Sequence, residues 1–194
     1  MSIGQPPDDS RSIEKKSTTT MTFRIDSDII LLMKEKAEQE GITLNTLVSH
    51  VLKRYAEWDM YIENRAGIIP LTRPVAFELF KRLSRGEVVN LANDVGKKAV
   101  YEIVLFMKGD INQISLVDWF LSRMKNSSAS VSLKNTNNGN RKAYIIKHDM
   151  GENWSLYHKT VLQAIFYDIL RKPLHVGTTE STLTLEIEID ETKK

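Results

Sequence analysis

A short alternating segment near the N-terminus constrains the fold of this chain more than any other feature. Residues 20–26 read TMTFRID, and this period of two is typical of a β-strand. One face would carry Thr20, Thr22 and Arg24, and the other Met21, Phe23 and Ile25. A lone strand leaves its backbone N–H and C=O groups unpaired, and no second strand is predicted within the first 70 residues. We therefore expect a second copy of the chain to supply the partner strand, across a two-fold axis.

Two helices are expected after this strand. Asp26 or Ser27 can cap the first helix, and Gly41 is suited to end it in a left-handed conformation. Thr43 can cap the second helix, whose apolar residues recur at helical spacing to about residue 61 or 62. The four helices of two chains would then pack over the apolar face of the paired strands.

In the order of these elements, residues 20–61 resemble a ribbon-helix-helix DNA-binding domain, the class of small repressors that includes Arc, MetJ and CopG. The resemblance implies that a two-stranded ribbon enters the major groove, where Thr20, Thr22 and Arg24 contact base edges. It also implies that the start of the second helix, at Thr43, Leu44 and Asn45, binds a DNA phosphate. Free backbone N–H groups and the helix dipole favour an anion at such a position.

The charge distribution bears on this resemblance. The whole chain has a formal charge of +2, and residues 1–69 carry 9 basic and 11 acidic side chains. Residues 11–25, however, have a net charge of +3, to which Lys15 and Lys16 contribute. Phosphates respond to local charge, because the screening length at physiological salt is about 8 Å. We therefore expect Lys15 and Lys16 to add phosphate contacts.

The remainder of the chain predicts a separate α+β domain. We divide the sequence into a flexible arm (1–19), a ribbon-helix-helix domain (20–63), a linker (64–71) and a C-terminal domain (72–194). Gly67, Pro70 and Pro74 mark the break. The C-terminal elements are expected as helices at 77–83, 87–107, 115–124 and 153–171, and as strands at 129–135, 141–148, 174–177 and 182–189. The strands predict a small antiparallel sheet covered by helices, with Asn137 to Asn140 as a hairpin tip.

One helix of this domain carries a candidate ligand pocket. Trp154, Tyr157 and His158 share a face at three- and four-residue spacing, and residues 148–155 form a turn-rich loop that leads into the helix. Such a stripe is more often core packing than a binding wall. The polar tips of Tyr157 and His158 nevertheless make it the best candidate for a small-molecule effector site.

Other chemistries have little support in the sequence. The chain has no cysteine, and His148, His158 and His175 lack the close spacing of metal ligands. Gly96-Lys97-Lys98 lacks the glycine and hydroxyl residues of a phosphate loop, and no catalytic motif is present. We therefore expect no enzyme activity, metal or cofactor. No apolar run approaches 18 residues and no secretory signal is evident, so a cytoplasmic location is expected.

These features favour a sequence-specific DNA-binding transcriptional regulator, most simply a repressor. Its expected partners are double-stranded DNA, a second copy in a homodimer or tetramer, and a small-molecule effector. An antitoxin that binds a toxin and represses its own operon is one alternative, although residues 72–194 have the periodicity of a folded domain. An architectural DNA-binding protein is another, although the near-neutral charge disfavours it.

Overall fold

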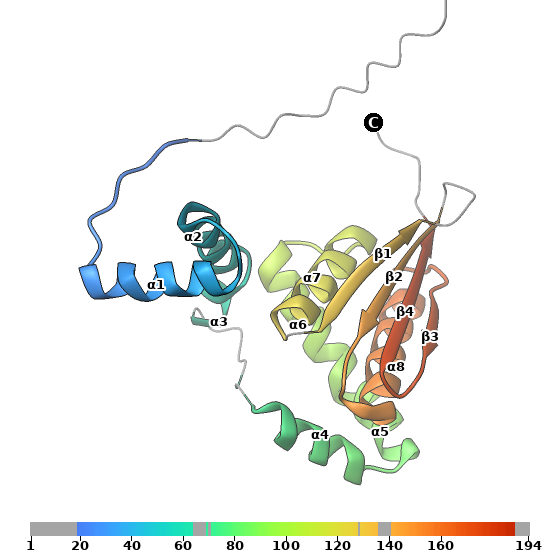
Figure 1. Ribbon diagram of the computed structural model, residues 1–194. Coiled ribbons are helices and arrows are strands. Elements are labelled where there is room, and N and C mark those ends of the chain that lie inside the picture. The colour runs from blue at the N-terminus through green and yellow to red at the C-terminus, as the bar shows by residue number, and fades with distance from the viewer. Residues whose placement is uncertain (1–18, 64–68, 70, 128, 136–140, 189–194) are drawn as a thin grey trace, which may run out of the picture. The chain divides into compact units, whose positions relative to one another are not determined.

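The computed structural model describes residues 19–63, 69, 71–127, 129–135 and 141–188 (Figure 1). Lys15, Lys16 and the expected hairpin tip at 137–140 lie outside these residues. The chain divides into two compact units, Met1–His50 and Val51–Lys194. This division lies N-terminal to the linker expected at 64–71, so that residues 51–63 are grouped with the C-terminal unit.

In the N-terminal unit, residues 19–26 have no regular secondary structure and are followed by α1 (Ser27–Gln39) and α2 (Leu44–Arg54). The strand predicted at 20–26 is therefore not formed in the single chain, because no described segment pairs with it. The turn between the helices is as expected: Gly41 has φ +66°, and Ile42 N–H donates to the Ala37 carbonyl at 3.0 Å. This bond, with that from Gly41 N–H to the Glu38 carbonyl, closes the helix end in a Schellman motif.

The long helix predicted to follow Thr43 changes its hydrogen bonding part-way along. After α2 comes a π-helical turn, η1 (Tyr55–Asp59), and then α3 (Met60–Glu63). Trp58, on the π-helical turn, is buried in the core of the C-terminal unit. This packing explains why the unit begins earlier than the Gly- and Pro-containing break suggests.

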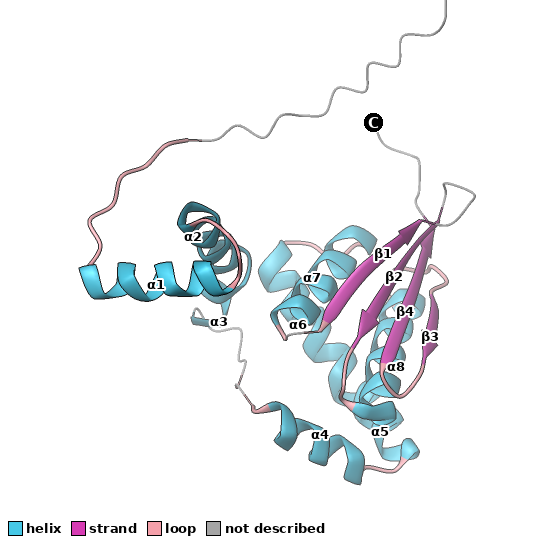
Figure 2. Ribbon diagram, in the orientation of Figure 1, coloured by secondary structure: helices cyan, strands magenta, loops and turns pink. Residues whose placement is uncertain are grey.

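The C-terminal unit is an α+β fold, which confirms this coarse prediction (Figure 2). Its helical segments are α4 (Arg73–Arg82), α5 (Arg85–Leu91), the π-helical η2 (Ala92–Gly96), α6 (Lys97–Lys108), α7 (Gln113–Asn126) and α8 (Gly151–Asp168). Its strands are β1 (Ser130–Asn135), β2 (Arg141–Lys147), β3 (His175–Thr178) and β4 (Thr182–Glu188). The strands form one antiparallel sheet in the order β1-β2-β4-β3.

Local signals fix where several of these helices start. Asn112 caps α7 by accepting the N–H groups of Ile114 and Ser115, at 2.8 and 2.9 Å. Ser84 and Glu87 form a capping box at the start of α5, where the Ser84 N–H and hydroxyl lower the pKa of the Glu87 carboxyl. These caps satisfy N–H groups that have no acceptor within their own helix.

The core of the C-terminal unit lies between one face of the sheet and the helices that cover it. Alternate residues of β4 are buried, namely Leu183, Leu185 and Ile187, as the period of two predicts. Leu183 and Leu185 belong to one cluster with Trp119 and Phe120 from α7 and with Ile165 and Phe166 from α8. Figure 1 shows α8 behind the sheet, with α6 and α7 alongside it.

Within the described residues, none of the helices combines the length and apolar character that crossing a bilayer would require.

Candidate functional site

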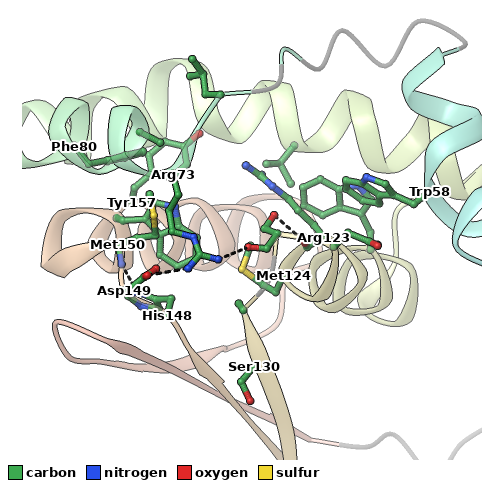
Figure 3. Close-up of a pocket in the computed structure, with 18 of the residues that line it drawn as sticks. Trp58, Arg73, Phe80, Arg123, Met124, Ser130, His148, Asp149, Met150 and Tyr157 are labelled. Atoms are coloured by element: carbon green, nitrogen blue, oxygen red, sulfur yellow. Dashed lines mark hydrogen bonds and ion pairs between the residues drawn. The ribbon is translucent and has the colours of Figure 1, made fainter. Parts of the chain in front are cut away.

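The C-terminal unit contains a pocket of about 870 Å³ (Figure 3). Its walls come from α4, α6, α7 and α8, from the end of α2 and from η1, from the start of β1 and the end of β2, and from the loop that joins β2 to α8. The large lining side chains are Trp58, Phe80, Trp119, Met124, Trp154 and Tyr157. The protein has three tryptophans, and all three border this pocket. Its volume falls within the range of small-molecule sites, and its aromatic lining is typical of them.

Arg123 on α7 gives this pocket its principal charge. Its guanidinium lies over the Trp119 ring, with the carbon Cζ 5.5 Å from the ring centroid. Within the part of the chain that the structure describes, no carbonyl or carboxylate oxygen accepts a hydrogen bond from this guanidinium. Burial lowers the pKa of Arg123, although an arginine still remains charged at neutral pH. Arg123 is thus a desolvated cation with donors available.

The other two arginines that line the pocket, in contrast to Arg123, form ion pairs. Arg73 donates to the Asp149 carboxylate at 2.8 Å and to the Ser127 carbonyl at 3.4 Å, and Figure 3 shows these bonds. The hydrogen bond from Arg73 lowers the pKa of Asp149 below its usual value. Arg54, which also lines the pocket, pairs with Asp59 at 3.2 Å. Asp149 is the only carboxylate among the described lining residues, and Arg73 offsets its charge.

His148 and Ser155 make a contact that resembles a catalytic pair. In a catalytic pair the serine hydroxyl donates to the histidine, whereas here the histidine donates to the serine. The Nδ1 atom of His148 accepts the Met150 N–H at 3.2 Å, so in the neutral ring Nε2 carries the proton. Nε2 lies 2.8 Å from the Ser155 Oγ atom and therefore donates to it. Burial lowers the pKa of His148, which favours this neutral form. Ser155 is fully buried, and its Oγ atom accepts a hydrogen bond from His148. The pair therefore holds the loop before α8 in place and provides no activated nucleophile.

The three residues predicted as a ligand pocket on α8 are divided between the pocket and the core. Trp154 and Tyr157 line the pocket. His158 is not among the lining residues: it is buried against Trp154, with ring centroids 3.9 Å apart, and its Nδ1 donates to the Trp154 carbonyl at 2.9 Å. Its Nε2 atom has no hydrogen-bond partner in the described residues.

Sequence reasoning did not identify Arg123, Trp119 or Trp58 as pocket residues. Trp119 and Arg123 are four residues apart on α7, which puts them on one helix face, but nothing in their spacing shows that α4 and α8 meet there. The missing information was tertiary.

The residues predicted to contact DNA lie in the N-terminal unit. Thr20, Thr22 and Arg24 are exposed in the segment before α1. Thr43 caps α2: its Oγ1 atom accepts the Thr46 N–H at 3.1 Å. The N–H groups of Leu44 and Asn45, by contrast, have no acceptor in the described chain. These two groups are therefore available to an external anion.

Among the described residues, no group of three or more histidine, aspartate or glutamate side chains could hold a metal ion. No family model matches the chain, and no curated protein matches it significantly.

Proposed function

We propose that this protein is a dimeric, sequence-specific DNA-binding regulator, most simply a repressor, in which residues 20–26 of two chains form an antiparallel ribbon. The observation that carries the proposal is an uncovered apolar face in the N-terminal unit. Met21, Phe23 and Ile25 expose 69%, 54% and 43% of their surfaces in the single chain. Three apolar residues at alternate positions of one segment form a stripe that water disfavours.

The first two helices add to this uncovered surface. Ile29, Leu31 and Leu32 on α1 are exposed, and only Ala37 of α1 is buried. Two short helices and an extended segment cannot enclose a core of their own at this size. A second copy of the unit would cover these residues and pair the backbone of residues 20–26 at the same time, which supports the intertwined dimer.

A paired ribbon would present the other face of the segment outward. Two antiparallel strands fit the width of the major groove. Arg24 can donate two parallel hydrogen bonds to guanine, and the threonine methyl and hydroxyl groups suit thymine or a base-edge acceptor. Specific readout is thus assigned to Arg24, Thr22 and Thr20 of each chain.

The start of α2 supports a phosphate contact. Thr43 satisfies the Thr46 N–H, whereas the N–H groups of Leu44 and Asn45 have no acceptor in the described residues. They lie at the positive end of an 11-residue helix. A phosphate there would fix the register of the ribbon, while base contacts set the sequence.

Selection from random double-stranded DNA at about 150 mM salt, followed by sequencing of the bound pool, tests this function. We expect a short repeated or palindromic motif, because a two-fold symmetric dimer reads two half-sites. Arg24→Ala should weaken binding to the selected site by about 1–3 kcal/mol. Lys34→Ala, an exposed cation on α1, is the matched control. Equal binding of wild type and Arg24→Ala over several salt concentrations would refute ribbon readout.

A further inference from the structure

The pocket of the C-terminal unit holds a partly buried cation, Arg123, whose donors have no acceptor among the described residues. The DNA-binding proposal does not explain this arrangement. An arginine removed from water costs free energy unless carboxylate, phosphate or carbonyl oxygens take the place of its hydration. The other two arginines of the pocket have such partners, in Asp149 and Asp59. Arg123 has none in the described residues.

We propose that this pocket binds a small organic anion, whose carboxylate or phosphate group is bound by Arg123 and whose apolar body packs against the aromatic walls. The guanidinium presents parallel N–H donors that match either of these anionic groups. This inference stands apart from the proposed DNA binding, since every residue that lines the pocket belongs to the C-terminal unit.

The walls of the pocket indicate that the anion is organic. If only an inorganic ion were bound, five large apolar side chains of the lining would stay in contact with water, namely Trp58, Phe80, Trp119, Met124 and Trp154. A pocket of about 870 Å³ is also far larger than a phosphate or sulfate needs. A ligand with one or two rings, or an equivalent aliphatic body, would fill it.

The charges that face the pocket are consistent with an anion. Asp149 is neutralised by Arg73 at 2.8 Å, and Lys147 adds an exposed cation at the end of β2. His148 also lines the pocket, and burial lowers its pKa, which favours the neutral ring. No uncompensated carboxylate in the described lining would repel the ligand.

Arg123 lies over the Trp119 ring and is close enough to Tyr157 and His158 for its charge to affect them, so a purely structural role must be tested as well. The two roles predict opposite effects on stability. A structural arginine would destabilise the fold when replaced, whereas removing a desolvated cation without acceptors is neutral or stabilising if an apolar side chain of similar size takes its place. Arg123→Met is such a replacement.

The test uses the full chain and four probes that share a phenyl group: 4-phenylbutyrate, phenyl phosphate, 4-phenylbutan-1-ol and 4-phenylbutylamine. Binding is followed by calorimetry and by tryptophan fluorescence, which reports on the pocket because all three tryptophans line it. We expect at least one anion to bind saturably, and at least about tenfold more tightly than the alcohol, with the amine weakest. The two anions distinguish a carboxylate ligand from a phosphate ligand.

Variants then assign the preference to Arg123. Arg123→Met should abolish the difference in affinity between the acid and the alcohol, while its melting temperature should equal or exceed that of wild type. Arg82→Met, an exposed arginine outside the pocket, should leave both unchanged. Should Arg123→Met fail to fold, Arg123→Lys keeps the charge without the fork and should reduce the preference.

Three results would overturn the proposal. The first is that neither anion binds saturably up to about 5 mM. The second is that acid and alcohol bind wild type equally. The third is that the anion preference persists in Arg123→Met or, if that variant does not fold, persists undiminished in Arg123→Lys.

Discussion

The hydroxyl oxygen of Tyr157 lies 2.6 Å from the point that a Cβ atom would occupy on Gly96, and the Val161 Cγ2 atom lies 2.7 Å from it. Gly96 ends the π-helical turn between α5 and α6, and its missing side chain lets α8 pack directly against this turn. Because Tyr157 also lines the pocket, the close approach helps to position one pocket wall.

Gly96→Ala should therefore destabilise the C-terminal unit. A methyl group at this point overlaps two side chains of α8, and overpacking of this kind costs about 1–3 kcal/mol. Gly86→Ala is the control: its added methyl meets no atom within 4 Å, so the lower chain entropy of alanine should stabilise α5 by up to about 1 kcal/mol. Urea unfolding of both variants measures the difference. A Gly96→Ala protein as stable as wild type would show that α8 can shift.

Asn153 joins α8 to the end of α4. Its Nδ2 donates to the carbonyl oxygens of Phe80 and Leu83, at 2.9 and 2.7 Å. Asn153→Ala should cost about 1–2 kcal/mol, because the Leu83 carbonyl loses its side-chain donor and the Phe80 carbonyl keeps only the Leu83 N–H. Asn153→Asp should cost more, since a carboxylate oxygen would then face those carbonyl oxygens.

Thermal and urea unfolding at neutral pH test this order. Asn90→Ala, an exposed asparagine on α5, should change stability by no more than about 0.5 kcal/mol. If Asn153→Asp proved as stable as wild type, the link between α4 and α8 would contribute little.

The secondary structure of the C-terminal unit was predictable because its signals are local. The alternation of Leu183, Leu185 and Ile187 matches β4, and the helix predicted at 115–124 lies within α7. The π-helical turns were not predicted, because no local pattern in the sequence distinguishes them from the α-helices that they interrupt.

The pocket could be predicted only in part, and for a similar reason. Trp154 and Tyr157 were recognised from helical spacing, but His158 packs toward Phe120 and Trp154 instead of the pocket. Which edge of a helix face borders a cavity depends on the helices beside it. Arg123 is a candidate because no described residue accepts a hydrogen bond from its guanidinium, and this depends on the tertiary structure.

His158 makes the stability of the fold depend on pH. Burial, reinforced by the charge of Arg123, lowers its pKa to about 3, although its bond to the Trp154 carbonyl acts in the opposite direction. The unfolded histidine has a pKa near 6.5, so the neutral native form contributes stability that is complete above pH 6.5 and is lost as the pH falls toward 3. One such group gives a slope of up to about 1.4 kcal/mol per pH unit.

Urea unfolding between pH 7 and pH 4 measures this slope. His158→Phe should flatten it, whatever its effect on stability at neutral pH. His148 contributes with the same sign, since burial lowers its pKa too, so some dependence should remain. His175→Gln, an exposed position on β3, should keep the wild-type slope. Parallel curves for wild type and His158→Phe would contradict the assignment to His158.

Phe23 and Thr22 are neighbours that the ribbon proposal assigns to opposite faces, which makes them a matched pair. Phe23→Asp puts a charge on the face that the second chain would cover, and burying a phenylalanine contributes about 1.5–3 kcal/mol per copy. Because a dimer contains this substitution twice, its dissociation constant should rise at least about a hundredfold. Thr22→Asp puts the same charge on the outward face, so the dimer should persist while DNA binding is lost through repulsion of the phosphates.

Sedimentation equilibrium measures assembly, and titration of the selected DNA site measures binding. If both variants remained dimeric, or if wild type were a monomer at micromolar concentration, the paired ribbon would be excluded and the exposed face of Met21, Phe23 and Ile25 would need another cover.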